Sequence, residues 1–357
     1  MSVERELKLH VLKSSRPAVE TRVNTAEAEH LHLHALYFDT HDRELAKAGV
    51  ALRLRKEPEG WVQTIKLPGQ DALSKIELNH LRPEPTLDLS VYIDSPAATI
   101  FEQLKSDLKI RFETDVHRSL RLQKADQGLI ELAYDTGFIR SEKLSLPVCE
   151  LEFELKEGQA EAMFELAQEW QQQIHFVLDF RSKAERGDAL ANALAATGGT
   201  DIDLKQLYQD LKLWHAWQLK DSNTGFSSTG DLNKLSSTQL KQQIQQHLEQ
   251  VARNAAVIAG IERSDMDLAI ELDVSKHIYY LSEALQTTRQ LCSALAQTET
   301  NNTSYDELQS TLKQQHQAFA ELSATASSTA IQQQAHDLAA SADFQQSLVK
   351  VLAWSIF

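Results

Sequence analysis

The feature that most constrains this chain is an alternation of charged and apolar side chains along several short segments of residues 1–200. In an extended strand, alternate side chains share a face. Residues 4–8 read Glu-Arg-Glu-Leu-Lys, so Glu4, Glu6 and Lys8 share one face, where they could hold a divalent metal beside an anion. Residues 149–156 repeat the pattern, with three acids and a lysine on one face and apolar residues on the other.

Other segments of this region alternate basic and apolar residues. Arg53 and Arg55 alternate with leucines at residues 52–55, and Lys66 ends a similar alternation at residues 64–66. A half-exposed strand ordinarily turns its charged face to water, so each segment alone fits a sheet with a solvated face. A closed barrel instead can turn alternate residues into a wet interior. The recurrence of such segments within one region favours the barrel.

These segments belong to a longer ordered series of motifs. The series consists of Glu-x-Glu-x-Lys at residues 4–8, Leu-Tyr-Phe-Asp-Thr at 36–40, Gly-Val-Ala-Leu-Arg-Leu-Arg at 49–55, Thr-Ile-Lys at 64–66, Phe-Glu-Thr at 112–114 with Arg118, Glu131 with Asp-Thr-Gly at 135–137, Glu-x-Glu-x-Glu at 150–154, and Ser-Lys at 182–183 with Arg-Gly at 186–187. In this order the series resembles the CYTH domain of the triphosphate tunnel metalloenzymes. The resemblance implies an α+β fold, in which an eight-stranded antiparallel β tunnel or barrel with flanking helices binds a triphosphate and uses Mg²⁺ or Mn²⁺.

Basic side chains inside such a tunnel would bind the substrate. A triphosphate has several negative charges, and the planar guanidinium of arginine matches the geometry of phosphate oxygens. The expected phosphate ligands are Lys8, Arg53, Arg55, Lys66 and Arg118, with Lys183 and Lys75 as further candidates.

The acids on the same faces would bind metal. Hard divalent cations prefer oxygen ligands, and Mg²⁺ usually takes only one or two carboxylates. The candidates Glu4, Glu6, Asp135, Glu150 and Glu152 exceed the needs of one ion, so they suggest two metal positions, one bridging phosphates and one orienting the attacking water. We expect Glu4, Glu6 and Lys8 to be the catalytic residues. Glu131 and Glu154 share the face and could instead pair with the basic residues.

A run of alternating histidines at residues 30–34 offers a different metal chemistry. A zinc site needs convergent ligands, usually in a closed tetrahedral set. His30, His32 and His34, with His41 nearby, could form one, but a partly exposed face is the favoured interpretation.

The composition fits a soluble enzyme of the cytoplasm. The net charge of −15 argues against general binding to nucleic acid or to an anionic membrane. The two cysteines are too few for a disulfide scaffold. The N-terminus lacks the features of a signal peptide, and no apolar run approaches the length of a membrane span.

The chain is expected to form two domains, a tunnel domain at residues 1–200 and a helical bundle at residues 201–357. Within the first, helices are expected at residues 96–108, with Ser95 as N-cap, and at 161–174. In the second, apolar residues recur with a helical period, among them Leu211 and Trp214, and the same period is found at residues 240–251 and 331–352. Trp214 and Trp217 are expected in the bundle core, and residues 221–225 and 300–303 look like exposed connections.

The second half resembles a CHAD domain only in position and helix content. CHAD domains are typically rich in basic residues, whereas residues 201–357 contain 11 Lys and Arg against 18 Asp and Glu. Such an acidic module is not expected to bind polyphosphate. Its expected role is stability, self-association or contact with a protein partner, and a fragment ending near residue 200 should then fold and remain active.

Together these observations predict metal-dependent hydrolysis of inorganic triphosphate to diphosphate and phosphate. Other reactions of the same site stay open: hydrolysis of thiamine triphosphate or a nucleoside triphosphate, or class IV adenylate cyclase chemistry. A non-catalytic binder of polyphosphate is the alternative from another class. Because all the matched acids are present, the enzyme is the favoured interpretation.

Overall fold

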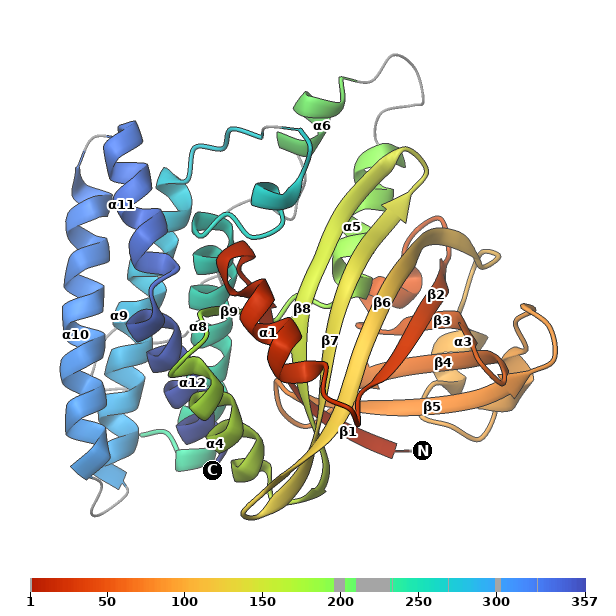
Figure 1. Cartoon of the computed structure of the whole chain (residues 1–357), viewed down its shortest axis with the longest axis horizontal. Coiled ribbons are helices and arrows are strands. Elements are labelled where there is room, and N and C mark those ends of the chain that lie inside the picture. Colours follow the sequence, from red (N-terminus) through yellow and green to blue (C-terminus); the bar gives the residue numbers. More distant parts are fainter. Residues whose placement is uncertain are drawn as a thin grey trace.

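The computed structural model describes residues 2–195, 203–209, 232, 234–268, 270–298, 303–325 and 327–357. Figure 1 shows a strongly curved β-sheet on one side of the molecule and a group of long helices on the other. Leu211, Trp214, Trp217 and the predicted connection at residues 221–225 lie outside the described residues.

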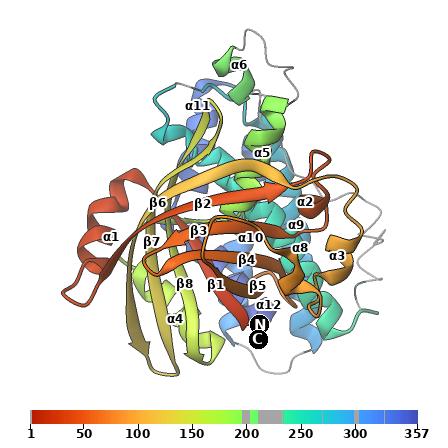
Figure 2. The ribbon, with the colours of Figure 1, turned by 90° about the vertical axis from the view of Figure 1, so that its right-hand side faces the viewer.

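The strands form one antiparallel sheet that closes on itself. In chain order they are β1 (Ser2–Val11), β2 (Glu29–Asp39), β3 (Ala51–Glu57), β4 (Gly60–Pro68), β5 (Ser74–Arg82), β6 (Lys109–Ala125), β7 (Gly128–Ser141), β8 (Leu144–Gly158) and β9 (Phe176–Leu178). The sheet order is β5-β4-β3-β2-β6-β7-β8-β1-β9, and β1 also pairs with β5, which closes a barrel of eight strands. The predicted barrel is confirmed, and Figure 2 views it from the side opposite the long helices.

Strand β1 both closes the barrel and extends the sheet. Its first residues pair with β5, residues 6–10 pair with β8, and residues 9–11 pair with the short strand β9. Strand β9 is not predictable from the sequence, because three buried residues give too short a pattern to distinguish a strand from a loop.

The two faces of the barrel wall separate charged from apolar side chains. Leu7, Leu9, Leu151 and Phe153 point away from the lumen into a hydrophobic core in which each is fully buried. The alternating charged residues therefore lie on the inner face. Of the two interpretations of the alternating strands, the structure selects the charged interior.

Short helices flank the barrel. They are α1 (Arg16–Val23), α2 (Glu44–Lys47), α3 (Ala98–Glu102), α4 (Ala160–Gln171) and α5 (Lys183–Ala195). The prediction for α4 was close, but α3 is much shorter than the predicted 96–108. Its N-cap is Ala97 rather than Ser95, whose hydroxyl accepts a hydrogen bond from the Ala97 amide at 3.2 Å.

The second half of the chain is helical, as predicted. Its helices are α6 (Leu204–Gln209), α8 (Ser237–Ile258), α9 (Ser275–Thr298), α10 (Thr303–Ala324), α11 (Thr329–Ala339) and α12 (Ala342–Ile356). A capping box of Ser236 and Gln239 begins α8. The apolar pattern at residues 331–352 belongs to two helices, because α11 ends before Ser341, which caps the start of α12. In the described part of the chain, no helix has both the length and the apolar character needed to cross a membrane.

The helices share one hydrophobic core with the outer face of the barrel. This core runs from barrel residues such as Leu9 and Phe153 to helical residues such as Ile244 and Leu348. Helix α12 contacts α4 and β9, and the side chain of Gln345 accepts a hydrogen bond from the Leu178 amide at 2.8 Å. The tunnel region and the helical region are therefore packed together through buried apolar surface.

Candidate active site in the tunnel

A cavity of about 350 Å³ lies inside the barrel, and all eight barrel strands and the start of α5 line it. Among its lining residues are most of the predicted site residues: Glu4, Glu6, Lys8, Arg53, Arg55, Lys66, Lys75, Arg118, Asp135, Glu152 and Lys183. Glu150 is the exception; it lies behind the lining, 1% exposed, beside Asp135. The topology thus gathers in one place residues that are widely separated in sequence.

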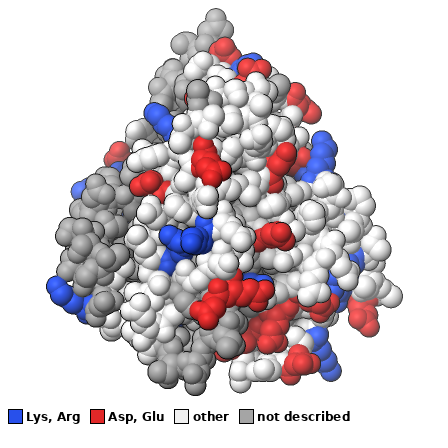
Figure 3. Space-filling view, turned by 90° about the vertical axis from the view of Figure 1, so that its left-hand side faces the viewer, with Lys and Arg blue, Asp and Glu red and all other residues white. Residues whose placement is uncertain are grey.

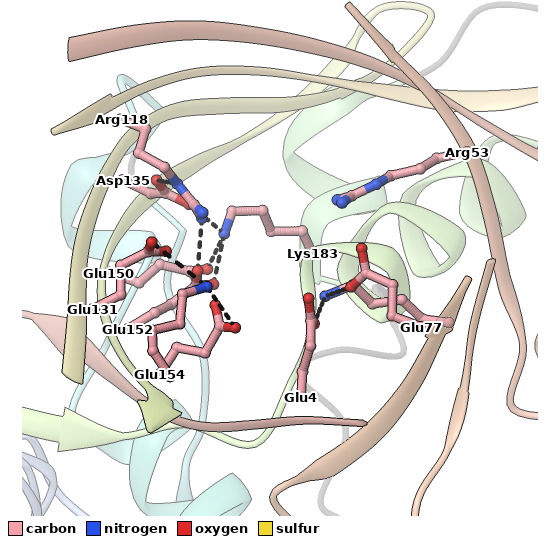
Figure 4. A network of polar contacts seen from close by, with 12 residues as sticks. Glu4, Arg53, Glu77, Arg118, Glu131, Asp135, Glu150, Glu152, Glu154 and Lys183 are labelled. Atoms are coloured by element: carbon pink, nitrogen blue, oxygen red, sulfur yellow. Dashed lines mark hydrogen bonds and ion pairs between the residues drawn. The ribbon is translucent and has the colours of Figure 1, made fainter. Parts of the chain in front are cut away.

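One wall of the tunnel centres on Lys66. Its ammonium nitrogen lies 2.6 Å from Oε2 of Glu4 and 2.9 Å from Oε2 of Glu77. Figure 4 shows Glu4 and Glu77 close together on this wall. Burial, followed by the adjacent carboxyl group of Glu77, raises the pKa of Glu4 to about 7. The pKa of Glu77 is lowered, because hydrogen bonding to Glu4 and the charge of Lys66 outweigh the effect of burial. The two carboxyl groups therefore share one proton near neutral pH.

Glu77 is a further residue of the tunnel wall that was not among the predicted site residues. It is 4% exposed, and it lies opposite Lys66 in the pairing of β4 with β5. Lys75, Glu77 and Asn79 alternate along β5 and all line the cavity. The alternation of every second residue that predicted the other strands also occurs in β5, so it could have indicated Glu77.

The opposite wall has a denser set of charges. Arg118 donates from Nε and Nη2 to the two oxygens of Asp135, each at 2.7 Å, and from Nη2 to Oε2 of Glu152 at 2.6 Å. Burial alone would raise the pKa of Asp135, but Arg118 and Lys183 hold it below its usual range. Strand register places these groups together, since Arg118 lies opposite Asp135, which in turn lies opposite Glu150.

Three acids of this wall form a candidate metal centre. Asp135, Glu150 and Glu152 each offer an oxygen atom, and these atoms lie within 4.8 Å of one another. Three convergent carboxylates suit a hard divalent cation such as Mg²⁺ or Mn²⁺. The ammonium group of Lys183 lies among them, 2.7 Å from Asp135, 3.1 Å from Glu152 and in contact with Glu150 (Figure 4).

The five predicted metal acids do not all meet at this cluster. Glu4 lies on the other wall with Lys66, and Glu6 is outside the group of three acids. Glu6 lies opposite Glu154 in the pairing of β1 with β8, whereas Lys8 lies opposite Glu152. This separation is compatible with two metal positions, which stay a prediction.

Several basic residues face the cavity with few acidic partners. Within the described residues, no ion pair is formed by Lys8, Lys75 or Arg53; the last approaches only the Tyr37 hydroxyl, at 3.4 Å. Arg55 pairs with Glu57, its Nε donating to Oε1 at 2.8 Å. The carboxylates of the lumen therefore leave some of its cations available to bind an anion.

As far as the structure describes the chain, Glu131 and Glu154 form no ion pair with the predicted phosphate ligands. Both lie near Lys156, whose ammonium nitrogen is 3.5 Å from Glu131 and 2.9 Å from Glu154. Lys156 also lines the cavity and was not among the predicted ligands.

The histidine run at residues 30–34 lies entirely within β2 and away from this cavity. His30 contacts Ser119 at 3.0 Å, His32 contacts Asp115 at 2.6 Å and His34 contacts Glu113 at 2.9 Å, all on β6. The side chains are at least partly exposed. This agrees with the favoured interpretation of a partly exposed face.

A second cavity of about 520 Å³ adjoins the tunnel. It shares Glu6, Lys8 and Lys75 with the first cavity and extends to Glu249 and Arg253 of α8. Its other lining residues include the aromatic side chains Tyr37, Phe38, Phe112 and Phe180. The helical region therefore forms part of the wall next to the candidate site, which the sequence analysis did not predict.

Comparison with known proteins agrees with this architecture. A family model described as the CYTH domain matches residues 2–187. An inorganic triphosphatase from Haemophilus influenzae is 32% identical over 201 residues, which cover 54% of this chain and 56% of that protein. The chain thus matches only about half the length of this relative.

Solved structures with similarity to the chain include two described as candidate cyclases. A Hippeastrum protein described as having a dominant triphosphatase activity is 15% identical, with a TM-score of 0.36, over 56% of this chain and 96% of that one. A Bacillus halodurans protein is 18% identical, with a TM-score of 0.33, over 48% of this chain and 91% of that one.

Proposed function

Because this chain belongs to the CYTH domain family, we propose that it is a metal-dependent triphosphatase that cleaves inorganic triphosphate to diphosphate and phosphate inside the barrel. The observation that most supports this proposal is that three convergent carboxylates lie at the wall of a cavity lined by cations, several of which form no ion pair within the described part of the chain. The identity of 32% to an inorganic triphosphatase supports this choice of substrate.

Cleavage of a phosphoanhydride needs positioning and charge neutralisation more than covalent participation by the protein. Lys8, Lys75 and Arg53 line the cavity and form no ion pair among the residues that the structure describes, so they are available to bind phosphate oxygens. Lys66 and Arg118 are paired with acids from the tunnel walls. A triphosphate would compete with those acids for the two cations, because phosphate oxygens accept the same charge-assisted hydrogen bonds.

The proposed metal ligands are Asp135, Glu150 and Glu152, with Glu4 and Glu6 available from β1. When bound, Mg²⁺ or Mn²⁺ would neutralise phosphate charge and lower the pKa of a coordinated water. The pair of Glu4 and Glu77 holds a proton near neutral pH, since the pKa of Glu4 is raised to about 7. This pair could therefore accept or release a proton beside the substrate.

A second candidate function is hydrolysis of an organic triphosphate, such as a nucleoside or thiamine triphosphate. The adjoining cavity of about 520 Å³ favours it, because aromatic and aliphatic side chains line space that inorganic triphosphate would not need. A non-catalytic polyphosphate binder is less favoured. On the helical face in Figure 3, the basic side chains lie apart from one another among acidic ones and form no continuous patch in the residues drawn in colour.

A phosphate-release assay with several substrates would test the proposal. Purified protein would be incubated with inorganic triphosphate, ATP, thiamine triphosphate or long-chain polyphosphate, each with Mg²⁺, Mn²⁺ or a chelator. We expect the highest kcat/KM with inorganic triphosphate and no turnover with the chelator. A preference for an organic triphosphate would favour the second candidate, and tight binding without phosphate release would refute the enzyme.

A further inference from the structure

The tunnel acid Glu150 is connected to the helical region by a buried chain of ion pairs. One guanidinium nitrogen of Arg186, on α5, contacts Oε2 of Glu150, and the other donates to Oε1 of Glu262 at 2.7 Å. The side chains of Arg186 and Glu262 are fully buried, and that of Glu150 is 2% exposed. Glu262 lies in the turn after α8, far from the barrel in sequence.

Beyond Glu262, the series of buried ion pairs continues to Arg181 and Asp179. Arg181 binds Asp179 through two hydrogen bonds of 2.9 and 3.0 Å, and its Nη1 lies 3.6 Å from Oε2 of Glu262. Glu262 thus lies between two arginines, of which only Arg186 continues to the tunnel. A buried guanidinium needs such partners, because a charge without one is costly in an environment that excludes water.

The backbone at Glu262 has an unusual conformation. Its φ is +65° and its ψ is −52°, and the Arg263 amide donates to the Ile261 carbonyl at 2.7 Å, which together define a classic γ-turn. Residues other than glycine rarely adopt a positive φ, and such conformations cluster at functional sites. The preceding Ile261 is fully buried, so packing fixes the turn that directs the Glu262 carboxylate inward.

We infer that Glu262 is a positioning residue of the tunnel, supplied by the helical region, which holds Arg186 in the orientation that fixes the Glu150 carboxylate at the edge of the acid cluster. This inference rests on the proposed function. Two effects follow from loss of the Glu262 charge. Arg186 would lose one of its two ion-pair partners and could reorient, and its charge would act more strongly on Glu150, which would make that carboxylate a poorer metal ligand. Removal of a direct partner of a metal ligand typically weakens metal binding by 10- to 100-fold, and Glu262 acts one step behind such a partner, so we expect an effect at the lower end of this range.

The matched control is Asp265, three residues further along the same turn. Its side chain is 6% exposed and contacts Arg16 at the start of α1, whose side chain is 25% exposed, so it also forms a largely buried ion pair between the two regions. The ion pairs that connect Glu262 through Arg186 to Glu150 do not include the pair of Asp265 and Arg16. Asp265→Asn therefore removes a comparable contact without disturbing Arg186.

The test is titration of the full chain with Mn²⁺ alone, followed by electron paramagnetic resonance, together with kcat and KM for triphosphate. We expect Glu262→Gln to raise the Kd for Mn²⁺ by about tenfold and to lower kcat. Asp265→Asn should change both values by less than about twofold, because the pair of Asp265 and Arg16 shares no partner with the acid cluster. A folded Glu262→Gln protein with the Mn²⁺ affinity of Asp265→Asn would overturn the inference.

A second variant covers the case in which Glu262→Gln does not fold. Glu262→Asp keeps the charge but withdraws the carboxylate from Arg186 by one methylene group. We expect its Kd for Mn²⁺ to exceed that of Asp265→Asn, and equal values would again contradict the positioning role. If the wild-type protein binds Mn²⁺ but hydrolyses no triphosphate, the proposed function fails, whereas the Mn²⁺ comparison still decides the role of Glu262.

Discussion

The ammonium nitrogen of Lys183 lies 2.7 Å from Oδ2 of Asp135, inside the group of carboxylates that could hold a metal ion. Lys183 also contacts Glu150 and Glu152, and the three acids raise its pKa despite its burial. The lysine therefore neutralises the acids in the absence of metal and would compete with a metal for them.

Replacement of Lys183 by methionine should separate these two effects. Without metal, the variant should melt at a lower temperature than the wild type, because three buried carboxylates lose their shared cation. Added Mn²⁺ should then raise the melting temperature of the variant more than that of the wild type, since the competing ammonium is gone. Differential scanning calorimetry with and without Mn²⁺ measures both shifts. Equal shifts in the two proteins would show that Lys183 does not compete for the metal.

Glu6→Gln should abolish turnover and leave the fold intact. The side chain lines the tunnel, and glutamine keeps its size while removing the charge that would hold a metal. Phosphate release and the melting temperature should therefore respond differently. The control is Glu165→Gln on the exposed surface of α4, which should change neither. Activity of Glu6→Gln close to that of the wild type at saturating Mg²⁺ would remove Glu6 from the proposed site.

Arg53→Ala and Arg55→Ala should each lower kcat/KM more than stability. Both line the tunnel, and a charge-assisted hydrogen bond to phosphate contributes about 1.5–3 kcal/mol, or roughly ten- to a hundredfold in kcat/KM. The control is Arg82→Ala, which breaks a surface ion pair with Asp88. Steady-state kinetics with triphosphate would measure the effects. Values of kcat/KM within about twofold of the wild type would place both arginines outside the substrate site.

His247 on α8 should make the protein less stable in acid. His247 is 6% exposed, and burial lowers its pKa from 6.5 to about 4. Between these two values the unfolded chain binds a proton that the folded chain does not, so the free energy of unfolding falls as the pH falls through that window. The contribution of this histidine is on the order of 3 kcal/mol across the window.

His247→Gln should therefore flatten the pH dependence of stability below pH 6.5. Urea unfolding of the variant and the wild type over a range of pH would measure the difference in slope. His41→Gln is the control, because the His41 side chain is 85% exposed. Parallel pH profiles for His247→Gln and the wild type would show that this histidine binds its proton equally well in both states.

Local patterns predicted the barrel and most of its inner residues, because a strand with charges on one face and leucines on the other has few ways to bury the leucines. They did not reveal which charges meet. The contacts of Arg118 with Asp135 and Glu152 depend on the register of β6, β7 and β8, which tertiary pairing decides.

Local sequence patterns also did not predict the contacts between the two halves of the chain. The helical period at residues 240–251 predicted α8 correctly, but it cannot show whether the apolar face packs on other helices or on the barrel. Glu262 has no periodic or motif signal, since its role follows from a turn that brings it to Arg186. The domain boundary at residue 200 stays a prediction.

These contacts reverse the expectation for a fragment that ends near residue 200. Its charged motifs would be complete, but Arg186 would lose Glu262, and the outer faces of α4 and β9 would lose α12. Truncation would also expose apolar residues that the full chain buries in one shared core. We now expect the fragment to be poorly soluble, and inactive where it remains in solution.

To test this expectation, residues 1–200 and the full chain would be expressed separately. Their soluble yield, melting temperature and triphosphate hydrolysis would then be compared. Addition of a separate 201–357 fragment should restore some solubility and activity, because it would supply both the buried apolar surface and Glu262. A soluble 1–200 fragment with the kcat and KM of the full chain would show that the helical region is dispensable for the reaction. That result would also contradict the positioning role of Glu262, since the fragment lacks the residue altogether.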